Sequence, residues 1–200
     1  MEIVNVFPTC LGLHKLDREL SDNEFNFITS LDKKKNKENS ISVNSYILES
    51  EELKDIKNWI SYSLTDYFNK IYKPKLSTEI YITQSWVNYT KKNESHHKHC
   101  HHNSFLSAVF YIKSNPNSGR IIFHKKESRE LVIDTDDYND YNADSYYMSV
   151  NNLELLIFPS NLMHSVEVVE MEEERISLAL NTFVKGQLGD ANDLSELYIA

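Results

Sequence analysis

The sequence predicts an α+β fold that is mainly β, with two helices first and about seven or eight mostly antiparallel strands after them. Before Pro74 the apolar residues recur at three- and four-residue steps, which is typical of helices. After Pro74 the period changes to two, which is typical of half-buried strands. Turn signals such as "NPNSG" and "PSNL" separate these strands. This order of elements favours a β-part that closes on itself or packs as a sandwich.

The helical part covers about residues 20–73 and contains two predicted helices. The first is "SDNEFNFITSL", where Ser21 and Glu24 have the spacing of a capping box. The second is "SEELKDIKNWISYSLTDYFNKIY", with Ser50 as its cap and Pro74 just beyond its end. The apolar residues that form one face of this second helix are Leu53, Ile56, Trp59, Ile60, Leu64, Tyr67, Phe68 and Ile71.

The β-rich core covers about residues 78–185, and residues 1–200 are predicted to form a single domain. Its expected strands are residues 79–90, 104–114, 120–125, 145–150, 153–159, 163–169 and 174–184. Earlier in the chain, residues 2–7 predict a short strand and residues 32–44 predict a loop. The acidic, Tyr-rich segment 127–147 is either a long surface loop or a lid over a binding site.

Composition excludes several classes of protein. The net charge is -9, and no basic stripe offers the phosphate neutralisation that nucleic-acid binding needs. No apolar stretch approaches the roughly 18 residues of a membrane span, and the N-terminus lacks the pattern of a signal peptide. Cys10 and Cys100 cannot form a disulfide framework, so we expect reduced thiols in a cytoplasmic protein. A homodimer is left open.

Five of the eight histidines stand in "HHKHCHH". In an extended segment His97, His99 and His101 would share one side, and His96 and His102 would point elsewhere. Two imidazoles at this spacing can bind one ion together, but a metal site needs a third ligand. His164, where a returning strand would begin, is the best distant candidate. The alternatives are a histidine-rich surface tract and an isolated surface histidine.

One face of "RISLALN" is polar. Arg175, Ser177 and Asn181 alternate there with the apolar residues of the other face. Arg175 follows His164 by eleven residues, so two antiparallel strands could bring both into one cavity. A metal at one end and a guanidinium further in would suit a dicarboxylate. The alternative is a surface ion pair between Arg175 and the acidic turn "EMEEE".

Several motifs in order carry a resemblance to a known family. They are "SWVNY", "HCHHNSFLSAVFY", "FPSNLMH" and "RISLALN". This series resembles the 2-oxoglutarate- and iron(II)-dependent oxygenases of bacteria and marine phages, with their W-x-N, H-x-H-P, F-P-x-x-x-x-H and R-I-S-x-x-F-N pattern. The resemblance implies a double-stranded β-helix (jelly-roll) fold, with the helices packed on its outer face. It also implies Fe(II) and 2-oxoglutarate as cofactors, with dioxygen and an unidentified substrate as partners, in a bacterial or phage-infected cell.

The resemblance also implies roles for individual residues. The implied metal ligands, which are also the catalytic centre, are His99, His101 and His164. The implied co-substrate residues are Arg175 for the far carboxylate, Ser177 beside it, Asn88, and with less defined roles Tyr111 and Asn181. The implied reaction hydroxylates a C–H group and releases succinate and carbon dioxide.

The chain departs from the family pattern at His102, where the family has Pro, and at Asn93 and Ala108, where it has Gly. Better-known oxygenases of the superfamily place Asp or Glu where this chain has His101. Three neutral imidazoles lack one negative charge, and zinc or copper would also accept them. Two other functions therefore stay open: a cupin-like three-His dioxygenase without 2-oxoglutarate, and a non-enzymatic jelly-roll binding module.

Overall fold

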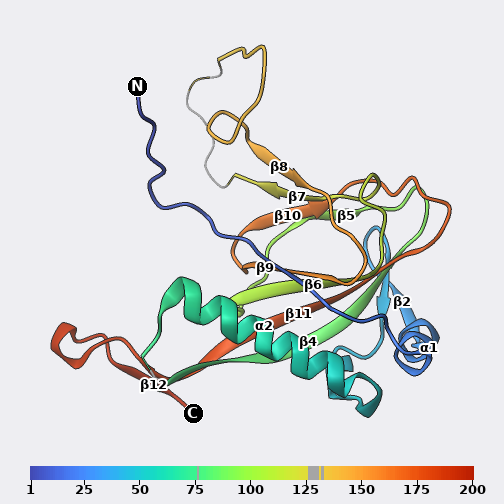
Figure 1. Ribbon diagram of the computed structural model, residues 1–200, viewed down its shortest axis with the longest axis horizontal. Coiled ribbons are helices and arrows are strands. Elements are labelled where there is room, and N and C mark those ends of the chain that lie inside the picture. The colour runs from blue at the N-terminus through green and yellow to red at the C-terminus, as the bar shows by residue number, and fades with distance from the viewer. Residues whose placement is uncertain (76, 126–130, 132) are drawn as a thin grey trace.

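The computed structural model of the protein describes residues 1–75, 77–125, 131 and 133–200 (Figure 1). Its α-helices are α1 (Asp22–Ser30) and α2 (Lys54–Tyr72), and its short 3-10 turns are Ile47–Glu49, Glu51–Leu53 and Ala191–Asp193. Its strands are β1 (Gly12–Lys15), β2 (Lys33–Lys35), β3 (Ser40–Ser42), β4 (Thr78–Thr90), β5 (His96–His99), β6 (Leu106–Lys113), β7 (Ile121–His124), β8 (Ser145–Met148), β9 (Glu154–Pro159), β10 (Met163–Val166), β11 (Arg175–Leu188) and β12 (Leu197–Ile199).

These strands form two antiparallel sheets. The larger sheet has the order β1-β9-β6-β11-β4-β3-β2, with β12 also paired to β11. The smaller sheet has the order β5-β10-β7-β8 and lies over one face of the larger sheet, while α2 lies along its other face (Figure 1). The predicted α+β, mainly β class with a sandwiched β-part is confirmed.

Alternation along β11 explains why the larger sheet has two different faces. Ile176, Leu178 and Leu180 lie in the main core, together with Ile60 and Leu64 of α2. Burying an aliphatic side chain of this size stabilises a fold by about 1.5–3 kcal/mol, so the apolar face of α2 is enough to hold the helix on the sheet. The predicted helix face is therefore confirmed, although Ile71 at its end is 43% exposed.

The inner face of the larger sheet meets the smaller sheet through a second, smaller core. Tyr111 of β6 and Phe158 of β9 pack there with Ile121 and Phe123 of β7. Tyr111 pairs in register with Ser177 of β11, so the polar face of β11 also turns toward the smaller sheet. The space between the two sheets is thus apolar at one side and polar along β11.

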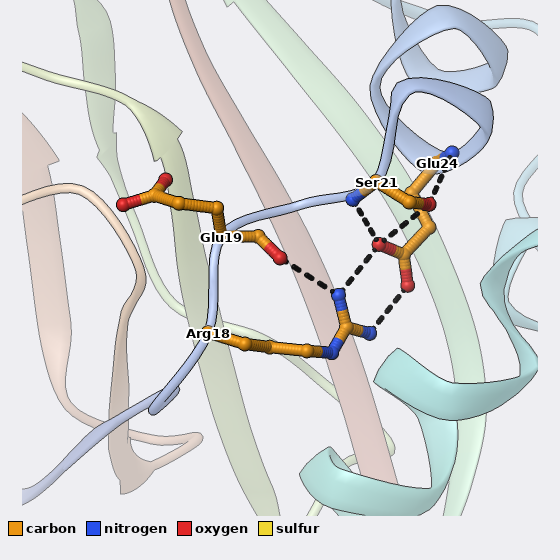
Figure 2. A network of polar contacts seen from close by, with 4 residues as sticks. All are labelled: Arg18, Glu19, Ser21 and Glu24. Atoms are coloured by element: carbon orange, nitrogen blue, oxygen red, sulfur yellow. Dashed lines mark hydrogen bonds and ion pairs between the residues drawn. The ribbon is translucent and has the colours of Figure 1, made fainter.

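Helix α1 begins as the sequence predicts. The Ser21 hydroxyl accepts from the Glu24 backbone N–H, and the Glu24 carboxylate accepts from the Ser21 N–H at 2.7 Å, which completes a capping box (Figure 2). Arg18 adds two hydrogen bonds to the same carboxylate, at 2.6 and 2.8 Å. Glu24 is buried by these contacts, and Arg18 holds its pKa below the usual range because it bonds the charged form.

Four local predictions were wrong. Residues 2–7 form no strand, because alternation makes a strand only where a sheet edge is available to pair with it. Residues 32–44 are not a loop throughout, since β2 and β3 form a hairpin there. Its lysine-rich strand is typical of protected sheet edges and lacks the alternation that reveals central strands. Ser50 does not cap α2, because the 3-10 turn Glu51–Leu53 lies between them. The Ser50 side chain makes no capping hydrogen bond to that turn either. His96 is the fourth, described with the site.

Part of the predicted lid, residues 127–147, lies outside the described residues, and the described remainder holds turns and the start of β8. A lid function stays a prediction. Within the described ranges, no helix is both long enough and apolar enough to cross a membrane.

Candidate metal centre

Neighbouring strands of the smaller sheet bring two histidines side by side. His99 of β5 pairs directly with His164 of β10, and their ring centroids are 4.3 Å apart. Directly opposite residues of antiparallel strands point to the same face, which explains the contact. His101 follows β5, where its backbone N–H donates to the Ser160 carbonyl at 2.9 Å. The structure therefore brings together the three histidines that the sequence singled out.

The geometry of these three imidazoles suits one ion. Their ligand nitrogens all lie within 4.8 Å of one another, and the Nε2 atoms of His101 and His164 are 3.3 Å apart. Two nitrogens about 2.1 Å from a shared ion, at bond angles of about 90–109°, are about 3.0–3.4 Å apart. The His101–His164 pair already has the separation that a common metal requires.

Hydrogen bonds determine which ring nitrogen of His99 and of His164 is free to bind a metal. Nδ1 of His99 lies 2.7 Å from the His97 carbonyl, and Nδ1 of His164 lies 2.9 Å from the Leu162 carbonyl. A carbonyl only accepts, so each Nδ1 carries the proton and each Nε2 presents its lone pair. Backbone carbonyls orient metal-binding histidines in this way in many proteins.

Burial keeps these imidazoles neutral. Desolvation lowers the pKa of His164 to about 3 and the pKa of His101 to about 4, and it also lowers the pKa of His99. Neutral imidazoles are the form that binds metals. Among the described residues, the group contains no carboxylate, so this candidate site offers three uncharged imidazoles.

His96 lies in this region too, contrary to the prediction that it points elsewhere. Its ring stacks on that of His99, with centroids 4.7 Å apart and planes at 16°. The reason is a bulge: His99 pairs with His164 and His96 with Val166, so the strand β5 advances three residues while β10 advances two. The extra residue breaks the alternation on which the prediction depended. His102 is exposed, as expected for a rim residue.

Arg175 begins β11 and is only 2% exposed. Its Nη1 donates to the Ser177 hydroxyl at 3.3 Å, its Nε is buried without a partner, and its guanidinium lies 5.1 Å from the centre of the Tyr111 ring. No carboxylate of the described residues pairs with it. The acidic turn pairs elsewhere: Glu172 with Lys92, Glu173 with Lys113, and Glu174 with Lys33. The alternative of a surface ion pair for Arg175 is therefore excluded.

Three further predicted residues form a row beside Arg175. Asn88 of β4, Ser177 of β11 and Tyr111 of β6 are neighbours in register across the larger sheet. The Asn88 Oδ1 and the Tyr111 hydroxyl are buried without a hydrogen-bond partner among the described residues. Burial raises the pKa of Tyr111 to about 12, although the neighbouring Arg175 guanidinium lowers it in part, so the hydroxyl stays protonated and able to donate. Unpaired buried polar atoms are rare in proteins, and their concentration here indicates a site for a polar ligand.

Asn181 does not join this row. It lies four residues further along β11, about 13 Å away on a strand, and its side-chain carbonyl accepts from the Ser107 hydroxyl at 3.0 Å. Ser107 contacts Ser160, whose backbone carbonyl binds the N–H of His101. Asn181 thus supports the loop beside His101 through Ser107 and Ser160.

The imidazoles and the arginine share one electrostatic environment. The pKa of His96 is lowered to about 3, first by burial and then by the neighbouring His99, His97, His164 and Arg175, in that order. The sequence analysis gave no role to two aromatic residues beside the imidazoles. They are Trp86 of the "SWVNY" motif, 5.8 Å from the His101 ring, and Phe158, 4.8 Å from the His164 ring. Trp86 could have been found, since it precedes Asn88 by two residues and so shares its face.

Comparison with known proteins gives the family. Residues 84–181 match the model of a family described as "Putative 2OG-Fe(II) oxygenase", a range that includes every candidate residue above. A search of curated protein sequences found no match.

Similar solved structures show the fold. HygX from Streptomyces hygroscopicus, with nickel and 2-oxoglutarate bound, has a TM-score of 0.60 at 10% identity, over 87% of this chain and 82% of that one. A prolyl hydroxylase from Trichoplax adhaerens has a TM-score of 0.60 at 12% identity, over 86% and 83%. A 2OG-Fe(II) oxygenase family protein from Burkholderia pseudomallei has a TM-score of 0.57 at 12% identity, over 79% and 74%. The predicted double-stranded β-helix is confirmed by these structures. Residues 84–181 of the chain belong to the 2OG-Fe(II) oxygenase family, whose enzymes depend on iron(II) and 2-oxoglutarate.

Proposed function

We propose that this oxygenase hydroxylates a C–H group of its substrate, with 2-oxoglutarate and dioxygen consumed and succinate and carbon dioxide released. The observation that carries the proposal is Arg175, a buried guanidinium without a carboxylate partner in the described residues. A buried charge costs several kcal/mol unless it is paired, so its retention indicates an anionic ligand. The far carboxylate of 2-oxoglutarate is an anion of the right kind.

His99, His101 and His164 would hold the iron. Their burial, their free Nε2 atoms and their spacing support this assignment. Bound iron supplies the oxidation chemistry, and the protein positions the reactants around it. Because the three ligands are neutral, the site keeps the full charge of the ion. An anionic co-substrate then contributes the charge balance that a carboxylate ligand provides elsewhere, so metal and 2-oxoglutarate should each strengthen the binding of the other.

Arg175 and Ser177 would bind the far carboxylate. The Nε and Nη atoms of a guanidinium offer two parallel hydrogen bonds to a carboxylate, and Nε of Arg175 has no competing acceptor among the described residues. The Tyr111 hydroxyl can donate a further bond, and the Asn88 amide can turn its nitrogen toward the same ligand. Gly119 makes room for the arginine, because a Cβ there would lie 3.2 Å from its Cδ.

A three-His dioxygenase without 2-oxoglutarate is the second candidate from the sequence. It explains the imidazoles but leaves Arg175 and the unpaired atoms of Asn88 and Tyr111 without a role. The buried polar row therefore favours the 2-oxoglutarate-dependent reaction. We also place the enzyme in the cytoplasm, where Cys10 and Cys100, both free, would stay reduced.

The test is the fate of 2-oxoglutarate. Anaerobic enzyme loaded with Fe(II) and 2-oxoglutarate is exposed to oxygen, and succinate is measured over time. The proposal predicts slow succinate formation without any added substrate, which requires iron and is lost in His164→Gln. The His102→Ala variant is the matched control, since this neighbouring histidine lies outside the site. Loss of oxygen without any succinate would instead support the three-His dioxygenase.

A further inference from the structure

Strand β5 carries a second group of three imidazoles beside the first. Its members are His96, His97 and His99, and their ligand nitrogens lie within 4.8 Å of one another. The ring centroids are 5.1 Å apart for His96–His97, 4.7 Å for His96–His99 and 4.9 Å for His97–His99. In the first group the corresponding distances run from 4.3 to 5.2 Å. The second group is as compact as the first and shares His99 with it.

An unsatisfied atom in this second group also points to a ligand. Nδ1 of His97 is buried and has no hydrogen-bond partner among the described residues. A buried imidazole nitrogen without a partner is unfavourable, and a metal ion would satisfy it. The group offers nitrogen ligands only, which suit zinc, cobalt, nickel or copper rather than magnesium or calcium. Small rotations of the rings would bring the nitrogens to the separations that one ion needs.

We propose that His96, His97 and His99 form a second site for a divalent transition metal such as zinc, and that this site competes with the first for His99. His99 can serve only one ion, because its Nδ1 donates to the His97 carbonyl and only Nε2 is free. An ion at the second site would leave the first site with only two protein ligands, His101 and His164. Given the proposed function, excess zinc would then weaken iron binding and inhibit the enzyme. It would do so by taking His99 from the first site rather than by occupying the iron position.

The experiment uses a variant that lacks the first site, so its outcome does not depend on the proposed function. In His101→Gln/His164→Gln, Co(II) binding is titrated by absorbance and calorimetry, with circular dichroism as the check on folding. The proposal predicts one bound equivalent. Adding His97→Ala to this variant should weaken Co(II) binding by about tenfold or more, since one of three ligands is lost.

Adding His102→Ala instead is the matched control, because His102 is in the same tract but in neither group. It should leave Co(II) binding unchanged. No stoichiometric Co(II) binding in the double variant would overturn the second site, and so would an equal loss from His97→Ala and His102→Ala, which indicates non-specific binding by the tract. The wild-type protein should hold one ion tightly. Two tightly bound ions would contradict the competition for His99.

Discussion

At the scale of single residues, the site depends on groups that are unfavourable in the protein alone. Arg175 is a buried cation with no carboxylate beside it in the described structure, and Asn88 and Tyr111 each bury an unpaired polar atom. Such groups persist when a ligand completes them. The sequence predicted that two paired antiparallel strands would bring Arg175 near His164, which is wrong, because β10 and β11 lie in different sheets. The burial of Arg175 without a partner also became visible only in three dimensions.

Arg175→Met should therefore raise the stability of the ligand-free protein. The substitution removes an unpaired buried charge and keeps a flexible apolar chain of similar length, so we expect a gain of about 1 kcal/mol or more in the free energy of unfolding. Urea denaturation without metal or 2-oxoglutarate measures it. Arg120→Met is the control, since Arg120 is paired with Glu167 at the surface and should change stability little. A clear loss of stability in Arg175→Met would mean that the guanidinium has a structural partner.

His101 offers the second prediction at this scale. Replacing it by Asp adds the negative charge that three imidazoles lack, so Fe(II) should bind more tightly in the absence of 2-oxoglutarate. The less positive site should in turn attract the dianionic co-substrate less. Anaerobic titrations of Fe(II), with and without 2-oxoglutarate, measure both effects. If the two ligands strengthen each other equally in wild type and His101→Asp, the charge argument is wrong.

At the scale of elements, regular periodicity was predictable and its interruptions were not. The face of α2 and the alternation of β11 were both readable, because each element is long and keeps one period. The short hairpin β2–β3 carries no alternation at its exposed lysines, so it was missed. The bulge opposite His164 and Val166 is set by pairing between β5 and β10, which no local pattern in β5 records.

The cap of α1 gives a prediction about pH. Arg18 lowers the pKa of Glu24 below its unfolded value, near 4.3. The resulting stability is fully present above the unfolded pKa and is lost as the pH falls through the folded pKa. Glu24→Gln should thus cost about 1–2 kcal/mol at pH 7 and progressively less below about pH 4.

Urea unfolding of wild type and Glu24→Gln between pH 7 and pH 3.5 measures this difference. Glu19→Gln is the control, because Glu19 contributes only its backbone carbonyl to the network (Figure 2). A stability difference that is constant across this range would show that the charge of Glu24 is not what Arg18 stabilises.

At the scale of the whole molecule, the two sheets carry different halves of the site. The histidines lie on the smaller sheet and the loop beside it, and Arg175, Ser177, Asn88 and Tyr111 lie on the larger sheet. A metal–2-oxoglutarate pair would therefore connect the sheets. The family resemblance named residues of both halves, and their action as one site stays a prediction. Their approach depends on the stacking of the sheets, which is a long-range property.

Binding should accordingly stabilise the fold in two separable steps. At a hundred times Kd a ligand adds about 2.7 kcal/mol, which for a chain of this size raises Tm by about 5–10 °C. Thermal melts with Mn(II), with and without 2-oxoglutarate, measure each step. In Arg175→Met the metal step should remain and the 2-oxoglutarate step should vanish. In His164→Gln both should vanish, and retention of the full metal step there would exclude His164 as a ligand.

The most direct test of the central claim is an anaerobic titration of the Fe(II)-loaded protein with 2-oxoglutarate, followed by the visible charge-transfer band of the iron–2-oxoglutarate complex. We predict a band that saturates at one equivalent in wild type and is absent in His164→Gln. In Arg175→Met we expect the band only at concentrations about a hundredfold higher or more, because a buried charge pair is lost. A wild-type protein that binds iron but shows no band, or an Arg175→Met variant that titrates like wild type, would contradict it.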